Sequence, residues 1–161
     1  MTNRPDPVAQ ADDAARALAR DLIAAARFAA LAVTDPTDGL PGISRIAFGP
    51  AHGGGFLTLI SALAPHHLAL LHNSDCALMV GEVGEKGDPL THPRLMIKAR
   101  AAFVASDTME RSAMREEWLI LHPKAKLYVD FADFSFVRFT PKSALLNGGF
   151  ARAYRLAPED L

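Results

Sequence analysis

The sequence predicts a mainly β fold, a small antiparallel barrel with peripheral helices. About seven short runs of strand character are joined mostly by tight loops. Short connections favour antiparallel pairing, because every parallel pair needs a crossover. Helical patterns do not alternate with the strands, which disfavours a doubly wound fold. A barrel fits this pattern because closure removes the unpaired edges of a sheet.

Length and charge narrow the class of protein. The chain has 161 residues, and we expect one domain over residues 9–161 behind a polar, flexible N-terminal arm at residues 1–8. Seventeen Lys and Arg against eighteen Asp and Glu give a net charge of −1, so the sequence predicts neither nucleic-acid nor anionic-membrane binding. The single Cys76 cannot form an intramolecular disulfide, and no apolar run approaches a membrane helix. We therefore expect a cytoplasmic protein.

The first half of the chain reads as a helix followed by three strands. Residues 9–28 carry apolar side chains at three- and four-residue spacing, which is typical of an amphipathic helix. Residues 29–34 and 43–48 are strand-like and flank the turn sequence DPTDGLPG, so they predict a hairpin. A third strand is expected over residues 56–60.

The second half adds four strands and a further helix. Residues 76–83 are an apolar run, and residues 94–104 alternate with the period of a strand that has one face buried. Asp107 and Glu110 have the spacing of a capping box for a helix up to about His122, with a short helical turn after Pro123. Strands over residues 134–139 and 144–156 complete the chain, with a bend or bulge at Gly148-Gly149.

The stretch from Phe56 to His72 is the centre of the functional prediction. An apolar strand runs through Ser61 into a helix expected to begin at Pro65, because proline suits the first turn of a helix. The free N–H groups and the positive dipole end of such a helix attract phosphate or carboxylate. The alternative is a structural junction that binds nothing.

Three stretches resemble one family. These are ISALAPHH at residues 60–67, GDPLTHPRLMIKARA at residues 87–101, and HPKAKLYVDFADFSFVRFTPKSALLNGGFARA at residues 122–153. They resemble the haem-utilisation branch of the pyridoxamine-5′-phosphate-oxidase-like FMN-binding split barrels. The resemblance implies a six- to seven-stranded antiparallel split barrel, and a homodimer that holds its cofactor at the subunit interface.

The resemblance also implies a set of cofactor-binding residues. The phosphate of FMN would contact Ser44, Arg45, Ser61, Ala62, Leu63, His66 and His67. Arginine suits a phosphate better than lysine does, and Arg45 interrupts an apolar strand, where a buried charge needs a partner. Arg94 is a second candidate cation, with an ordinary surface arginine as the alternative.

Two further residues have both a functional and a structural interpretation. Trp118 would cover a cofactor ring from the partner subunit, or else pack in the core with its helix. The resemblance implies that Asp133 lies near the interface cavity; the alternative is that it caps a turn beside the neighbouring aromatic residues.

The chain departs from its branch at several positions. His67 and Ala69 stand where the branch usually has threonine and asparagine, and Ala151 stands where glycine is commoner. Haem-degrading relatives carry an iron-ligating histidine in a C-terminal extension, whereas the residues after Phe150 contain no histidine. No metal site is predicted at His66 and His67, because adjacent helical residues point about 100° apart.

No nucleophile–base series, Walker loop or dinucleotide fingerprint occurs in the sequence, so any chemistry would belong to a bound cofactor. The leading prediction is an FMN-binding oxidoreductase that acts on an unidentified small molecule. A haem-binding or haem-degrading protein is the first alternative. A non-catalytic dimer that has lost its cofactor is the second. No catalytic residue is assigned.

Overall fold

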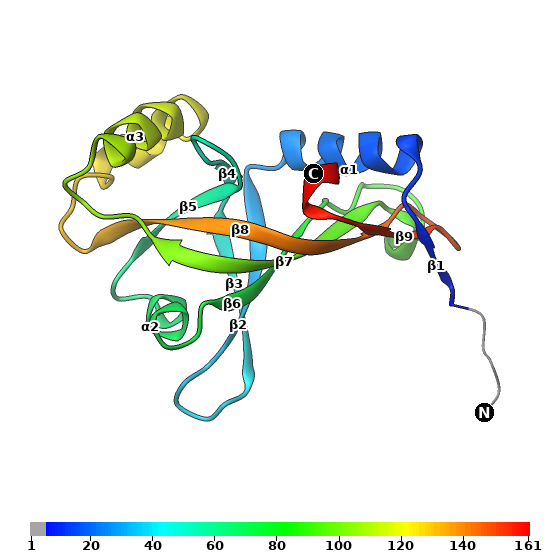
Figure 1. Cartoon of the computed structure of the whole chain (residues 1–161), viewed down its shortest axis with the longest axis horizontal. Coiled ribbons are helices and arrows are strands. Elements are labelled where there is room, and N and C mark those ends of the chain that lie inside the picture. Colours follow the sequence, from blue (N-terminus) through cyan, green and yellow to red (C-terminus); the bar gives the residue numbers. More distant parts are fainter. Residues whose placement is uncertain (1–5) are drawn as a thin grey trace.

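The structure is a computed structural model that describes residues 6–161 (Figure 1). The α-helices are α1 (Asp13–Ala25), α2 (Pro65–His72) and α3 (Met109–Leu121), and the 3-10 helices are η1 (Pro89–Thr91), η2 (Pro123–Leu127) and η3 (Pro158–Asp160). The strands are β1 (Val8–Gln10), β2 (Phe28–Thr34), β3 (Pro41–Ala47), β4 (Gly49–Pro50), β5 (Phe56–Ser61), β6 (Asp75–Val80), β7 (Arg94–Phe103), β8 (Phe134–Asn147) and β9 (Ala153–Leu156).

All the strands belong to one mainly antiparallel sheet, which confirms the predicted fold class. Its main path runs β1-β9-β8-β7-β6-β2-β3, and β5 pairs with β8 and β4. The nine strands exceed the predicted number because of the short β1, which pairs in parallel with β9, and the short β4. The sheet curls from β5 round to β3 without a backbone ladder between those two strands, so the barrel is split rather than closed.

A buried threonine spans the split. Thr58 of β5 is fully buried, and its hydroxyl donates a hydrogen bond of 2.7 Å to the carbonyl oxygen of Ala47 in β3. A buried hydroxyl without a partner would be costly, so this bond stabilises the approach of the two strands. The seam is therefore joined by a side chain where the backbone ladder is missing.

Two hydrophobic cores lie on opposite faces of β5. Phe56 and Ile60 face the main core inside the barrel, whereas Leu57 and Leu59 face a second core that contains Met114 and Trp118 of α3. Successive side chains of a strand point to opposite faces, so both faces are apolar when both are covered. This explains why the strand is an uninterrupted run of buried residues from Phe56 to Ile60.

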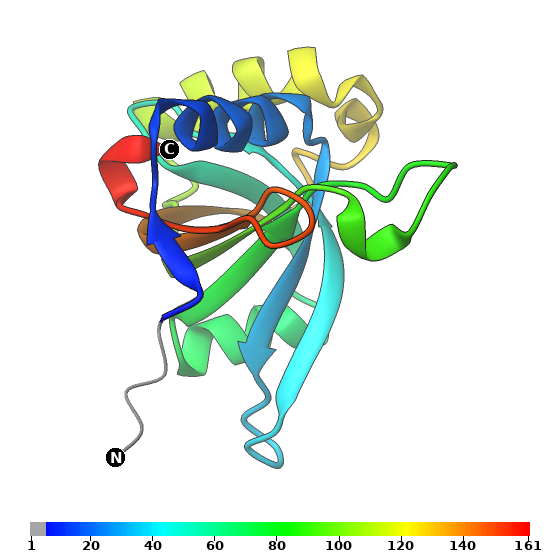
Figure 2. The same cartoon turned by 90° about the vertical axis from the view of Figure 1, so that its right-hand side faces the viewer.

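The helices cover different sides of the sheet. In the views of Figures 1 and 2, α1 and α3 lie above the sheet, whereas α2 and the β2–β3 hairpin lie below it. Ala15 and Ala19 of α1 are buried against the main core. The Asp12 carboxylate caps α1 by accepting a hydrogen bond of 2.7 Å from the amide of Ala15.

Several element boundaries differ from the predictions. The first helix begins at Asp13 rather than near residue 9, because residues Val8–Gln10 pair with β9. Residues 1–5 of the predicted arm lie outside the described residues. The cap of α3 is Thr108, whose hydroxyl accepts a 3.1 Å hydrogen bond from the amide of Arg111, so the predicted capping box of Asp107 and Glu110 is wrong.

The end of the chain forms one long strand and one short strand. The predicted break between residues 139 and 144 lies within β8, where a β-bulge accommodates the proline at position 141. Gly148 and Gly149 form the turn into β9, and Gly149 has a φ of 122°. Only glycine adopts this conformation without strain, so these glycines end β8 rather than bend it.

Candidate functional site

The junction between β5 and α2 is formed as the sequence predicts. Ser61 ends β5, and Pro65 begins α2. The Ser61 hydroxyl donates to Asp133 Oδ2 at 2.8 Å and accepts from the amide of Leu63 at 3.1 Å. The amide of Ala62 donates to the Asp133 carbonyl oxygen at 2.7 Å. The polar groups of this turn are thus engaged within the chain, and a phosphate at Ser61 would lie beside a carboxylate.

The first turn of α2 retains few free donors. The amide of Ala64 donates to the carbonyl oxygen of Ser61, and the amide of His67 donates to the carbonyl oxygen of Ala64. Pro65 has no N–H. Among the described residues, the His66 amide has no acceptor. The helix start therefore offers one backbone donor where the sequence predicted several.

The two adjacent histidines contact different parts of the molecule. His66 Nδ1 lies 3.1 Å from the Ser44 hydroxyl, which joins α2 to β3. The His67 ring instead packs edge-on against Phe103 with centroids 4.9 Å apart. Only His66 therefore reaches the strand that carries Arg45.

Arg45 lies on the outer face of β3 and is exposed. Its guanidinium carbon is 5.4 Å from the centre of the Phe28 ring, and it has no ion-pair partner within residues 6–161. The expectation of a buried charge is wrong, because the described structure leaves this face of β3 uncovered. A cavity of about 310 Å³ opens here, lined by Phe28, Ala30, Ile43, Ser44, Arg45, Met79 and Gly81.

Arg94 and Trp118 are engaged elsewhere. Arg94 Nη1 donates to the carbonyl oxygens of Leu90 at 3.2 Å and His92 at 3.5 Å, so it braces the loop that precedes β7. Trp118 is 2% exposed, and its ring centroid is 4.1 Å from that of His122 and 5.9 Å from that of Phe136. Its position in the second core matches the packing interpretation.

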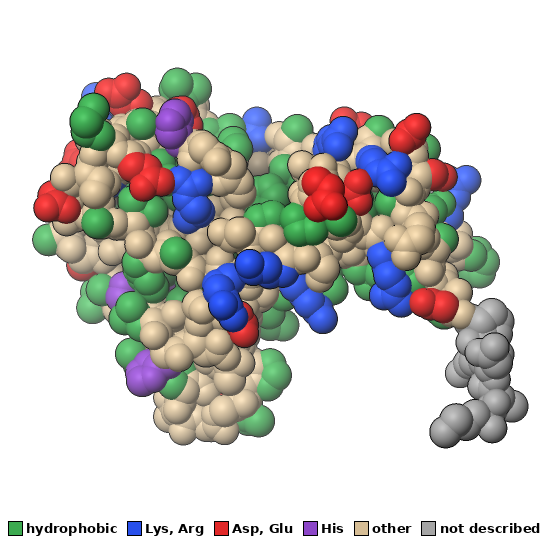
Figure 3. Space-filling view, viewed as in Figure 1, with side chains coloured by type: hydrophobic (Ala, Val, Ile, Leu, Met, Phe, Trp, Pro, Cys, Tyr) green, Lys and Arg blue, Asp and Glu red, His purple; other side chains and the backbone are tan. Residues whose placement is uncertain are grey.

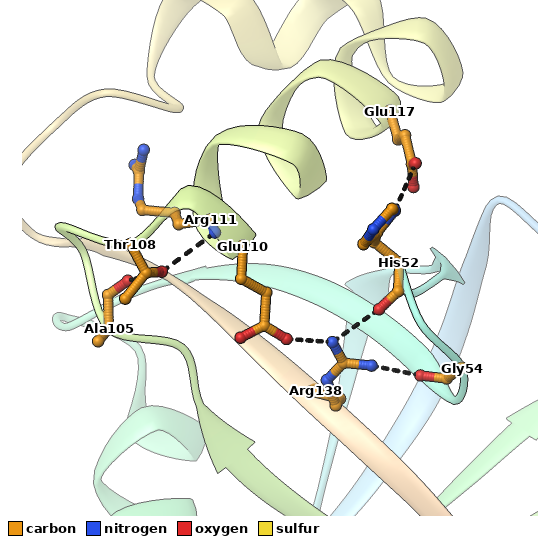
Figure 4. Close-up of polar contacts among 8 residues, drawn as sticks. All are labelled: His52, Gly54, Ala105, Thr108, Glu110, Arg111, Glu117 and Arg138. Atoms are coloured by element: carbon orange, nitrogen blue, oxygen red, sulfur yellow. Dashed lines mark hydrogen bonds and ion pairs between the residues drawn. The ribbon is translucent and has the colours of Figure 1, made fainter.

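An ionic network that sequence reasoning missed surrounds Arg138 (Figure 4). Arg138 of β8 pairs with Glu110 of α3 and donates to the carbonyl oxygens of His52, at 2.7 Å, and Gly54. The His52 ring in turn lies 2.8 Å from the Glu117 carboxylate. The network holds the loop between β4 and β5 against α3. Arg138 interrupts an apolar run just as Arg45 does, so the same signal was available there.

We expect Arg138→Ala to lower the free energy of unfolding by about 2–3 kcal/mol, because hydrogen bonds to a charged group each contribute about 1.5–3 kcal/mol before solvent screening. Urea unfolding measures the change. The matched control is Arg100→Ala, whose exposed pair with Asp75 at 3.0 Å should contribute less than about 1 kcal/mol. Equal losses in the two variants would contradict a special role for Arg138.

Stability should also fall in mild acid. The pKa values of His66 and His122 are both lowered, chiefly because burial disfavours the charged imidazolium. The neighbouring His67 adds to the effect at His66; at His122 the hydrogen bond to the Phe48 carbonyl oxygen opposes it and Arg27 adds to it. The unfolded chain, with histidine pKa values near about 6.5, therefore binds more protons than the folded chain as the pH falls. We expect urea midpoints to decrease from about pH 7 to about pH 5.5. Replacing both histidines by glutamine should flatten this dependence, whereas a profile that stays steep would refute the assignment.

Neither a metal site nor a membrane-spanning helix is found in the described part of the chain. Among residues 6–161, no three His, Cys, Asp or Glu side chains gather as metal ligands. No helix in this range has the length and apolar character needed to cross a bilayer.

The chain is similar in sequence and in structure to several known proteins. No family model matches the chain. The chloroplastic non-canonical haem oxygenase HOZ of Arabidopsis thaliana is 33% identical over 117 residues, which cover 73% of this chain and 35% of that protein. A haem-binding protein from Mycobacterium smegmatis superposes with a TM-score of 0.81 at 25% identity, over 93% of this chain and 60% of that one. The chain thus spans 35% of the first relative and 60% of the second, less than two thirds of each.

A further solved structure concerns the fold. A protein of the pyridoxinephosphate oxidase family from Clostridium acetobutylicum, related to general stress protein 26, superposes with a TM-score of 0.70 at 14% identity. The match covers 94% of this chain and all of that one. This match shows the fold alone. The sequence similarity to the two haem-related proteins above, together with the split sheet, shows that the chain is similar to the haem-utilisation branch of the pyridoxamine-5′-phosphate-oxidase-like split-barrel family.

Proposed function

We propose that the chain is an FMN-binding flavoprotein that oxidises or reduces a small molecule. The observation that carries this proposal is the cavity over β2, β3 and β6, which combines apolar walls with Arg45. A flavin mononucleotide has the matching composition, a planar ring and a phosphate dianion. FMN, when bound, supplies the electron-transfer chemistry for which no residue of the chain is assigned.

The residues at this cavity fit the two parts of FMN. The Arg45 guanidinium, which has no ion-pair partner among the described residues, would bind the phosphate. The Ser44 hydroxyl lies on the other face of β3, next to His66, so it would not be a donor to the same phosphate. Phe28, Ile43 and Met79 would pack against the ring. Ser61, Ala62 and Leu63 would support the turn rather than bind the phosphate, because their polar groups are already engaged.

A homodimer would complete the site. Ile43 is 76% exposed, Met79 is 45% exposed and Phe28 is 41% exposed, and all three line the cavity. A second copy that covers this apolar face would enclose the cofactor at the subunit interface. Sedimentation equilibrium measures the mass, and a monomer at micromolar concentration with FMN bound would contradict the dimer.

Haem is the second candidate ligand, and two observations favour it. The relative from Arabidopsis thaliana is a haem oxygenase by name. His66 is half-buried beside the cavity residue Ser44, and its lowered pKa keeps the imidazole neutral at pH 7, the form that ligates iron. Under this alternative His66, rather than Arg45, is the residue on which binding depends.

Absorption spectroscopy of the purified protein distinguishes the candidates. We expect FMN to bind with a dissociation constant below about 10 µM, seen as a perturbed flavin spectrum during titration. A Soret shift with haem that is lost in His66→Ala, without FMN binding, would replace the first proposal by the second. Failure of both ligands at about 100 µM would leave the non-catalytic dimer.

A further inference from the structure

A second cavity, of about 450 Å³, opens on the same face of the sheet as the Arg45 cavity. The two cavities share no lining residue, but Ala30 of one and Ala32 of the other are two positions apart on β2 and so face the same way. Ala32 pairs with Ala77 of β6 across the strands. These small side chains leave the middle of the sheet hollow, with an apolar floor.

Two lysines stand at the side of this hollow. Lys98 of β7 is the cross-strand partner of Ala77. Lys142 is the extra residue of a β-bulge, since Lys98 pairs with Ser143 and Ala99 pairs with Pro141. Both lysines line the cavity. Neither ammonium has a hydrogen bond or an ion pair within residues 6–161, so the bulge adds a second unpaired lysine to the lining of this cavity.

The other polar groups of the hollow do not neutralise these charges. Asp75 is the acidic residue among the described lining residues, and Arg100 binds its carboxylate at 3.0 Å. Burial and the Asp75 charge raise the pKa of the Cys76 thiol to about 12, so the thiol is uncharged. Figure 3 shows Lys and Arg side chains gathered along the concave lower edge of the molecule, where β7 and β8 cross the view.

We propose that this hollow is a binding site for a small organic anion, distinct from the cofactor cavity. A carboxylate or phosphate group would lie between Lys98 and Lys142, and an apolar body would lie on the floor formed by Ala32 and Ala77. Two ammonium groups in one cavity bind an anion better than one isolated surface lysine does. The cavity volume lies within the range of small-molecule sites.

Fluorescence titration with 8-anilinonaphthalene-1-sulfonate, an apolar anion, tests the proposal. The Arg45→Ala variant serves as the background, because it removes the cation of the neighbouring cavity. We expect saturable binding that weakens at least about tenfold when Lys98 and Lys142 are both replaced by alanine. The double arginine variant keeps both charges and should keep the binding. Lys124→Ala with Lys126→Ala, on η2, is the matched control for lost charge and should change nothing.

Three outcomes would overturn the site. The first is unchanged probe affinity in the double alanine variant, and the second is an equal loss in the η2 control. The third is a changed sedimentation mass of the double alanine variant without the probe, which would place the lysines at a contact between copies of the chain. The FMN proposal is separable, because FMN affinity measured with wild-type Arg45 should survive both lysine substitutions.

Discussion

Trp118→Ala is expected to lower the free energy of unfolding by about 3–5 kcal/mol, the usual cost of removing a buried tryptophan. The indole is 2% exposed and packs against the rings of His122 and Phe136. Its removal would leave a cavity among Leu57, Leu59 and the helix α3 that the other side chains of this core are too few to fill. Urea unfolding monitored by circular dichroism measures the loss.

Ile120→Ala is the matched control, since it lies on the same helix and is 84% exposed. Its effect should stay within about 0.5 kcal/mol. The packing role predicts that folded Trp118→Ala protein keeps its FMN affinity. If Trp118→Ala kept the wild-type free energy of unfolding but no longer bound FMN, the indole would instead cover the cofactor.

Arg45→Ala is expected to weaken FMN binding by about 100-fold, because it removes the only cation among the described residues that line the cofactor cavity. The side chain is exposed, so stability should change by less than about 0.5 kcal/mol. Titration of the flavin spectrum measures the affinity. Arg45→Lys should give an intermediate value, because lysine keeps the charge but loses the planar fork.

Arg94→Ala separates the two candidate cations. Arg94 donates to the backbone of its own loop, so its loss should leave FMN affinity within about threefold of the wild type. The opposite pattern, with binding lost at Arg94 and kept at Arg45, would move the phosphate away from the β3 cavity. A non-catalytic dimer without a cofactor predicts no change of any kind from Arg45→Ala.

The local sequence was enough to identify most elements. Proline at the first position of α2 and the glycine-rich turns mark element ends through their backbone preferences alone. Strict alternation over β7 identified a strand with one covered face. The predicted start of the first helix was wrong, because pairing with the distant β9 decided the conformation of residues Val8–Gln10.

Arg45 and Arg138 show that the sequence pattern of a strand does not predict which of its faces is covered. Arg45 and Arg138 each interrupt an apolar strand, yet Arg45 is exposed on an open face, whereas Arg138 lies beneath α3 and the β4–β5 loop. Alternation tells which residues share a face of a strand, but it does not tell which face another element covers. That depends on where α3 packs.

Short-range physics therefore specified the strand–turn–helix junction, the antiparallel sheet and the apolar character of β5, because backbone preference and side-chain period act within a few residues. Other contacts join residues distant in the chain. They are the Ser61–Asp133 hydrogen bond, the Thr58–Ala47 hydrogen bond, and the pairing of β7 with β8 in which a bulge places Lys142 beside the partner of Lys98. Such contacts arise only when the sheet curls and its strands take their register. Tertiary structure thus decided which predicted binding groups remain free and which the chain itself uses.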